Sequence, residues 1–179
     1  MSPKIATIAL VFASTVVLDQ LSKIVVDRTL PLHVSIPVIE NFFNLTYIRN
    51  KGAAFGMLAN SPETFRLAFL LVFSVTAIGF LIVALRRLPA SERALTVALS
   101  LILGGAIGNL IDRFLYGEVI DFLDFHWSGY HWPAFNLADS FITIGVGLAL
   151  CRLATAKDED PFAPKKDRPR RSSLDAAGK

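Results

Sequence analysis

The chain has 179 residues, of which 53% are hydrophobic and 18% are charged, with a net charge of +3 and a mean hydropathy of +0.51. Soluble domains carry about 25% charged residues. The deficit, together with the clustering of charges between long apolar runs, argues against an ordinary soluble domain. The single cysteine, Cys151, excludes an internal disulfide.

Four apolar segments are predicted to cross a membrane as helices, at about residues 5–26, 67–85, 94–112 and 136–155. A helix rising 1.5 Å per residue needs about 20 residues to cross a hydrocarbon core about 30 Å thick. The fourth segment has only 12 uncharged residues, from Ser140 to Cys151. It reaches spanning length only if Asp139 lies inside it.

Orientation follows from the basic residues that flank the spans. The short connection between the second and third spans carries three basic residues and one acid in positions 86–93. This predicts a cytoplasmic connection, cytoplasmic termini, and two longer loops, 27–66 and 113–135, on the outside. Residues 157–179 mix both charges with proline and lack periodicity, so we predict a disordered cytoplasmic tail.

The outer loops contain patterns of regular structure. Apolar and polar residues alternate in 41–48, which predicts a half-buried strand, and 119–125 is a second strand-like stretch. Ser61 and Pro62 are typical of an N-cap followed by the first helical residue, and they predict the start of the second span.

Charged residues within a span need an explanation, because a charge near the bilayer centre costs from about 3 to more than 10 kcal/mol. Asp19 and Lys23 are four residues apart in the first span, with the acid first. That is the favourable order for a helical ion pair. We interpret them as a pair that neutralises itself and anchors the helix, in preference to a catalytic role.

Further polar residues end the third span. Asn109, Asp112 and Arg113 share one helical face, and the preceding Gly104 and Gly108 allow close helix approach. One interpretation is an interface cap in which Asp112 and Arg113 face water. Asn109 fits this interpretation less well, because an amide within a span needs a hydrogen-bond partner.

Two acids, Asp121 and Asp139, could meet at the same depth near the outer end of the bundle. Asn136 lies three residues before Asp139 and shares its helical face, whereas Asp124 faces the opposite side of a strand from Asp121. Two neighbouring carboxylates share a proton, so one can activate water while the other polarises a carbonyl. The spacing therefore permits an aspartic peptidase site.

Other functions would use the same residues. Asp19, Asp112 and Asp139 could form the relay of a small proton-coupled transporter, and packing through Gly104 and Gly108 could serve a non-enzymatic scaffold. His126 and His131 are separated by an interval that is not a standard helical spacing for zinc ligands, so no metal site is predicted.

Five motifs in order closely resemble the bacterial lipoprotein signal peptidase (signal peptidase II) family. These motifs are Asp19–Lys23, Asn50–Gly56, Gly104–Arg113, Val119–Phe122 and Phe135–Ser140. The resemblance covers most of residues 5 to 155 and leaves the charged tail outside it. It implies an all-α membrane protein of four transmembrane helices, with a small extracytoplasmic β-sheet cradle and a short outer-loop helix.

The resemblance also implies an activity. The protein would be an aspartic endopeptidase, needing no cofactor, that cleaves diacylglyceryl-modified prolipoproteins before the lipidated cysteine at the outer face of the inner membrane. Asp121 and Asp139 would be catalytic, with Asp19 and Lys23 as structural support. The residues expected to line the site are Asn50, Gly52, Gly105, Asn109, Arg113, Asn136 and Ala138.

Two further expectations concern substrate and assembly. Gly52 and the small residues before Phe55 suggest a loop that covers the substrate. The partners expected are the lipid-modified substrate and membrane lipids, without nucleic acid. A monomer is expected, because a four-span bundle can satisfy its own polar faces.

Overall fold

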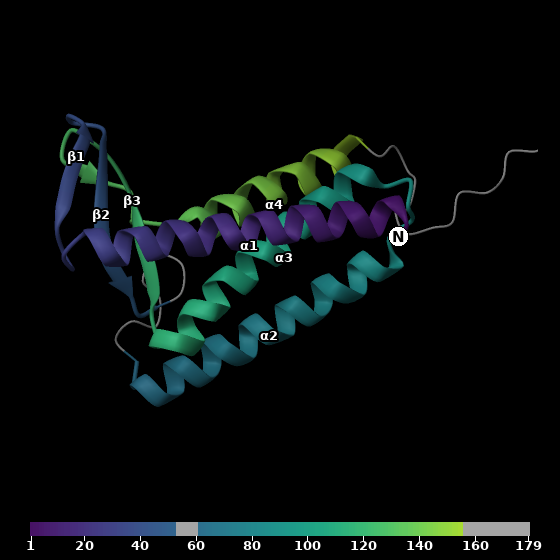
Figure 1. The fold of residues 1–179 in the computed structure, drawn as a ribbon, viewed down its shortest axis with the longest axis horizontal. Helices are drawn as coiled ribbons and strands as arrows, with labels where there is room; N and C mark the ends of the chain where they lie inside the picture. The colour runs from purple at the N-terminus through teal and green to yellow at the C-terminus, as the bar shows by residue number, and fades with distance from the viewer. Residues whose placement is uncertain (53–60, 156–179) are drawn as a thin grey trace, which may run out of the picture.

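The computed structural model describes residues 1–52 and 61–155 and contains four long helices with a small sheet at one end (Figure 1). The helices are α1 (Pro3–Thr29), α2 (Glu63–Arg87), α3 (Arg93–Tyr116) and α4 (Leu137–Thr155). The strands are β1 (Ser35–Ile39), β2 (Phe43–Asn50), β3 (Val119–Trp127) and β4 (Tyr130–His131). This arrangement confirms the predicted combination of four apolar helices with a small sheet.

All four helices are long and apolar enough to cross a membrane. The shortest, α4, has 19 residues and carries Asp139 in its first turn. The start of α2 differs by one residue from the prediction. Pro62 combines a helical φ of −52° with an extended ψ of 135°, so it takes the N-cap position and the helix begins at Glu63. Ser61 is therefore not the N-cap.

The central helix is α3, which packs against each of the other three helices. Its glycines permit this contact. A Cβ at Gly104 would lie 2.6 Å from the Thr15 side chain of α1, and a Cβ at Gly108 would collide with the Asp19 carboxylate. These glycines are thus used for packing within the chain.

The antiparallel sheet has the order β1-β2-β3-β4. Strand β2 starts two residues later than predicted, because Asn41 turns the chain with a φ of 60°, in the left-handed region that asparagine tolerates. It also ends two residues later. Asn50 is consequently inside the sheet and pairs with Val119 of β3.

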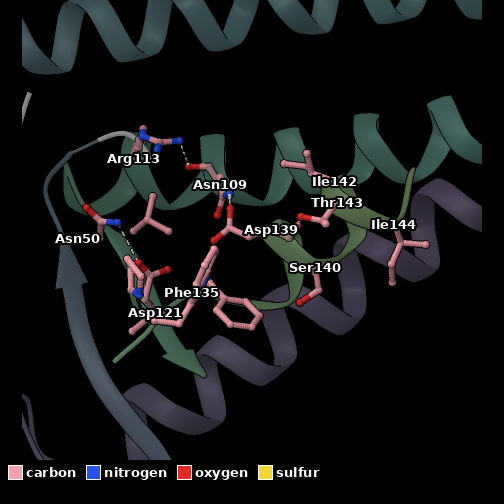
Figure 2. Close-up of a pocket in the computed structure, with 14 residues that line it drawn as sticks. Asn50, Asn109, Arg113, Asp121, Phe135, Asp139, Ser140, Ile142, Thr143 and Ile144 are labelled. Carbon is pink, nitrogen blue, oxygen red and sulfur yellow. Dashed lines mark hydrogen bonds between the residues drawn. The ribbon is translucent and has the colours of Figure 1, made fainter. Parts of the chain in front are cut away.

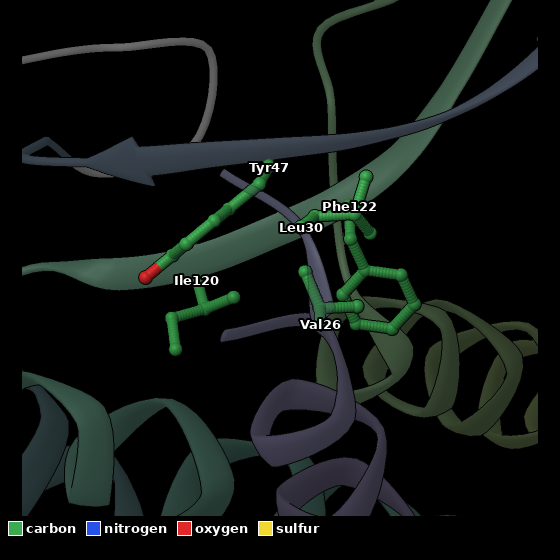
Figure 3. Close-up of a cluster of buried hydrophobic side chains, with 5 residues drawn as sticks. All are labelled: Val26, Leu30, Tyr47, Ile120 and Phe122. Atoms are coloured by element: carbon green, nitrogen blue, oxygen red, sulfur yellow. The ribbon is translucent and has the colours of Figure 1, made fainter. Parts of the chain in front are cut away.

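Apolar packing fastens the sheet to the end of α1. Val26 and Leu30 form a buried cluster with Tyr47 of β2 and with Ile120 and Phe122 of β3 (Figure 3). This cluster fixes β3 relative to the helices, which determines where Asp121 lies.

A polar contact reinforces that attachment. The Tyr47 hydroxyl donates a hydrogen bond to Asp27 near the end of α1, and Arg49 Nη2 lies 2.8 Å from the same carboxylate. The Arg49 guanidinium also lies 4.6 Å from the centre of the Tyr116 ring, at the end of α3. Strand β2 is thereby linked to two helices just before Asn50.

Some predictions concern residues outside the described ranges. Within residues 1–52 and 61–155 there is no short outer-loop helix besides α1 to α4. The proposed covering loop, beyond Gly52, and the tail at 157–179 lie outside the described residues.

Candidate active site

A cavity of about 600 Å³ lies at the sheet end of the bundle, between α3, α4 and β3 (Figure 2). Both Asp121 and Asp139 line it. The other lining residues are Asn50, Asn109, Arg113, Val119, Trp132, Pro133, Ala134, Phe135, Ser140, Ile142, Thr143 and Ile144. The fold thus brings together residues that are widely separated in the chain.

Asp121 is held on β3 by two side-chain amides. Asn50 Nδ2 donates to Oδ2 at 2.9 Å, and Asn136 Nδ2 donates to Oδ1 at 2.7 Å. Only 2% of the residue is exposed. Burial, followed by the negative charge of Asp139, raises the pKa of Asp121 to about 7, while the two amides oppose that rise. Asp121 can therefore hold a proton near neutral pH.

Asp139 belongs to a reciprocal cap at the start of α4. The Asn136 side-chain oxygen accepts from the Asp139 backbone N–H at 3.0 Å, and Asp139 Oδ2 accepts from the Asn136 backbone N–H at 3.4 Å. This is the geometry of a capping box, with asparagine and aspartate in the two roles. The cap fixes the direction of the Asp139 carboxylate before any substrate binds.

Asn136 connects the two acids, because its side chain caps Asp139 through oxygen and contacts Asp121 through nitrogen. It is fully buried. Asn109 completes the arrangement by donating from Nδ2 to Asp139 Oδ1 at 2.8 Å. Three asparagine side chains, Asn50, Asn109 and Asn136, thus hold the two carboxylates.

Lys23 determines which way Asn109 faces. Its Nζ lies 2.8 Å from Asp19 Oδ2, 2.9 Å from Asp112 Oδ2 and 3.0 Å from Asn109 Oδ1. An ammonium group only donates hydrogen bonds, so Asn109 must present its oxygen to Lys23. Its amide nitrogen is then directed toward Asp139.

The predicted ion pair of Asp19 and Lys23 is present, but the water-facing interpretation of Asp112 is wrong. Asp112 is 1% exposed and also accepts from the Ile120 backbone N–H at 3.2 Å. Its partners come from a different helix and from the sheet, which helical spacing within α3 could not reveal. Asp19 Oδ1 accepts from the Ala138 backbone N–H at 2.9 Å, so the ion cluster also holds the start of α4.

Arg113 supplies positive charge to the cavity. It donates from Nη1 to the Asn109 carbonyl at 3.4 Å and from Nη2 to the Gly52 carbonyl at 3.5 Å. Its buried Nε has no hydrogen-bond partner within residues 1–52 and 61–155. Gly52 in turn donates its N–H to Asn50 Oδ1 at 2.9 Å, which orients the Asn50 amide nitrogen toward Asp121.

Not every predicted site residue lies at the cavity. Four of the expected residues are absent from its lining: Gly52, Gly105, Asn136 and Ala138. Gly52 and Asn136 instead contact side chains that line it. A Cβ at Gly105 would collide with the Ala138 carbonyl, so Gly105 and Ala138 serve the close approach of α3 and α4. Asp124 is paired with His131 Nδ1 at 2.9 Å and with Asn44 at 3.0 Å, apart from the cavity lining.

Sequence reasoning missed several lining residues. Thr143 lies one helical turn after Asp139 and donates to its carbonyl at 2.8 Å, so helical spacing could have identified it. Ile142 and Ile144 looked like ordinary span residues. Trp132, Pro133 and Ala134 precede α4 and carried no signal beyond their aromatic and proline content, whereas Phe135 belongs to the motif Phe135–Ser140.

Comparisons with known proteins identify the family of the chain. Residues 11–155 match the family model described as signal peptidase (SPase) II. The lipoprotein signal peptidase of Geobacter sulfurreducens is 49% identical over 148 residues, covering 83% of this chain and 91% of the relative. That of Syntrophotalea carbinolica is 52% identical over 144 residues, covering 80% and 88%.

A solved structure described as a bacterial membrane enzyme superposes with a TM-score of 0.74 at 34% identity, covering 87% of this chain and 94% of that one. A second structure of the same description gives a TM-score of 0.74 at 36% identity, covering 86% and 96%. The family match and the identity over most of the length show that this chain belongs to the signal peptidase II family of lipoprotein signal peptidases.

Proposed function

We propose that Asp121 and Asp139 are the catalytic pair with which this peptidase cleaves diacylglyceryl-modified prolipoproteins before the lipidated cysteine. The observation that carries the proposal is that both carboxylates line one cavity, held by amides on neighbouring elements. An arrangement of two carboxylates supports peptide hydrolysis without a metal or a nucleophilic side chain.

In the proposed reaction Asp121 begins protonated and Asp139 ionised. The elevated pKa of Asp121, about 7, supports this assignment. Asp139 takes a proton from water as the water oxygen attacks the scissile carbonyl carbon, and Asp121 gives its proton to the carbonyl oxygen. Breakdown of the tetrahedral intermediate returns the proton to Asp121, while Asp139 passes its proton to the departing amide nitrogen as the C–N bond breaks.

Arg113 is proposed to orient the substrate backbone. Its Nε is buried, has no hydrogen-bond partner within residues 1–52 and 61–155, and is available to a substrate carbonyl. A charged donor beside the reacting carbonyl also stabilises the oxygen that gains negative charge in the transition state. Asn109 and Asn136 then have positioning roles, because they hold the acids.

The site is proposed to face the outer side of the inner membrane, with both termini in the cytoplasm. The support is the basic connection at 86–93, which lies at the end of the bundle opposite the sheet. Substrate acyl chains would remain in the bilayer beside Ile142 and Ile144, while the peptide enters the polar part of the cavity. A monomer is proposed because the charged groups inside the bundle pair within the chain.

Nothing in the described residues favours the alternative function, a proton-coupled transporter with Asp19, Asp112 and Asp139 as its relay. Asp19 and Asp112 are held by Lys23 and are not among the residues that line the cavity with Asp139.

Two versions of one substrate test the proposed function. Purified enzyme should cleave a diacylglyceryl-modified prolipoprotein, releasing a product whose first residue is the lipidated cysteine by mass spectrometry. The same precursor without the diacylglyceryl group should remain intact. Equal cleavage of both precursors would exclude the proposed substrate class.

Topology needs a separate test. Cys151 is replaced by serine, and Ser128→Cys in the β3–β4 hairpin is compared with Ser91→Cys in the short connection; both serines are exposed. A membrane-impermeant maleimide added to spheroplasts should label position 128 and leave position 91 unlabelled until the membrane is opened. The reverse pattern would overturn the orientation.

A further inference from the structure

A second cavity lies at the end of the bundle opposite the sheet, between the first turns of α1 and the last turns of α2. Its volume is about 510 Å³, within the ~300–1,000 Å³ usual for small-molecule pockets. Figure 1 shows that α1 and α2 approach each other at this end and diverge toward the sheet. Leu103 of α3 also lines the cavity. Because the lining residues Ile5 and Ile82 are exposed, the cavity is a crevice open to the outside of the bundle.

The walls of the crevice are aliphatic. Ile5 of α1 is 53% exposed and Ile82 of α2 is 39% exposed, although both line the cavity. Because these helices are long and apolar enough to span a bilayer, their exposed aliphatic side chains would face hydrocarbon. A flexible hydrocarbon chain therefore fits the walls.

The mouth of the crevice is basic. Lys4 and Arg86 line it, in the first turn of α1 and the last turn of α2. Lys4 Nζ donates to the Leu88 carbonyl, which leaves two of its three N–H groups available. Arg86 has no hydrogen bond or ion pair within residues 1–52 and 61–155.

Within residues 1–52 and 61–155, no acid forms an ion pair with Lys4 or Arg86. The acid of the short connection, Glu92, is paired with Arg152, whose Nη2 lies 2.8 Å from Oε1. Two cations above an apolar crevice form the complement of a phosphate attached to an acyl chain. Basic side chains at the ends of spanning helices lie at headgroup depth, where they attract anionic lipids.

We propose that this crevice binds an anionic glycerophospholipid, with its phosphate between Lys4 and Arg86 and one acyl chain along Ile5, Ile82 and Leu103. The site is at the far end of the bundle from Asp121 and Asp139 and shares no lining residue with their cavity.

Native mass spectrometry of the full chain in detergent tests the headgroup preference. Palmitoyl-oleoyl phosphatidylglycerol and phosphatidylcholine with the same chains are added in equal amounts. The wild type should retain phosphatidylglycerol preferentially. Arg86→Gln should reduce that preference about fivefold, the effect of losing one basic contact near a membrane surface. Arg87→Gln is the matched control, because Arg87 carries the same charge one residue later and does not line the crevice.

A second variant tests the acyl part of the proposal. Ile82→Trp fills the apolar wall without changing charge and should lower the binding of both lipids. Equal binding of the two lipids by the wild type would overturn the proposal. Equal losses in the two arginine variants would do so as well, since they indicate a general attraction of charge. Unchanged lipid binding in Ile82→Trp would remove the crevice as the site.

Discussion

The ammonium group of Lys23 lies 3.0 Å from the side-chain oxygen of Asn109, and this contact joins a buried ion cluster to the cavity lined by Asp121 and Asp139. The other two donors of Lys23 are occupied by Asp19 and Asp112. The same Asn109 amide donates to Asp139. The buried charges of α1 thus help to orient the Asp139 carboxylate, because Lys23 holds the Asn109 amide that donates to it.

Replacing Lys23 by methionine should therefore damage both folding and catalysis. The change leaves Asp19 and Asp112 buried without a cation, and removing one partner of a buried pair costs about 3–5 kcal/mol. The Asn109 oxygen also loses its charged donor and keeps only the Asn136 amide at 3.2 Å. Thermal unfolding in detergent and cleavage rates should both fall. Lys51→Met is the control, because the Lys51 side chain is 58% exposed and its Nζ lies 3.5 Å from Glu118. The control should keep wild-type stability. Wild-type stability in Lys23→Met would contradict the structural role of Lys23.

Asn136 has two separable roles. Asn136→Ala removes both the cap of α4 and the bond to Asp121, and should lower stability by about 1–2 kcal/mol and strongly reduce kcat. Asn136→Ser restores a good N-cap residue but cannot reach Asp121 in the same way. It should recover stability in denaturation measurements while leaving kcat low. Recovery of full activity in the serine variant would show that only the cap matters.

The raised pKa of Asp121 predicts a trade-off between activity and stability. Its pKa is about 7 in the folded chain, against 3.8 as the ordinary value. Unfolding then releases a proton between about pH 4 and pH 7, so the folded state loses stability as pH rises through this window. Asp121→Asn removes the titration, and should be inactive yet more stable than wild type above about pH 7.

The stability difference between wild type and Asp121→Asn should shrink as pH is lowered toward 4. Unfolding curves measured across this range provide the test, with Asp124→Asn as a control at a site outside the cavity. A difference that grows on acidification would reverse the sign and contradict the burial argument. Wild-type kcat should also decline above about pH 7, as Asp121 loses its proton.

Close packing of α1 on α3 predicts unequal effects of two glycine substitutions. A methyl group at Gly108 would collide with the Asp19 carboxylate, so Gly108→Ala should cost about 1–3 kcal/mol. Gly147 of α4 has nothing within 4 Å of an added Cβ. Gly147→Ala should be neutral or stabilise by about 0.5–1 kcal/mol through helix propensity. Equal effects on the unfolding midpoint would refute the close approach.

Most of the predictions about the fold and the site came from patterns within short segments of the sequence. The pairing of Asp19 with Lys23 follows from helical spacing within one span, and the opposite directions of Asp121 and Asp124 follow from strand alternation. Asp139 was identified because the fourth span is too short without it. Each inference needed only residues close together in the sequence.

Contacts between distant segments were not predictable in this way. Asp112 resembled an interface residue because its partner Lys23 lies in another helix. The spacing of Asn136 and Asp139 predicted a shared helical face but not their capping box, and the contact of Asn136 with Asp121 depends on how α4 meets β3. Gly105 and Ala138 were expected at the site and instead fill the contact between helices, because a small residue serves either purpose equally well.

A double-variant cycle tests the central claim, that Asp121 and Asp139 act as one unit on a single water. Single-turnover cleavage of the diacylglyceryl-modified substrate is measured for Asp121→Asn, Asp139→Asn, the double variant and Asp124→Asn. General acid–base groups contribute about 10²–10⁴-fold. Each single variant should lose at least about 10²-fold, the double variant should lose no more than the worse single one, and Asp124→Asn should retain activity. Near-wild-type activity in either single variant, or losses that multiply in the double variant, would contradict the shared mechanism.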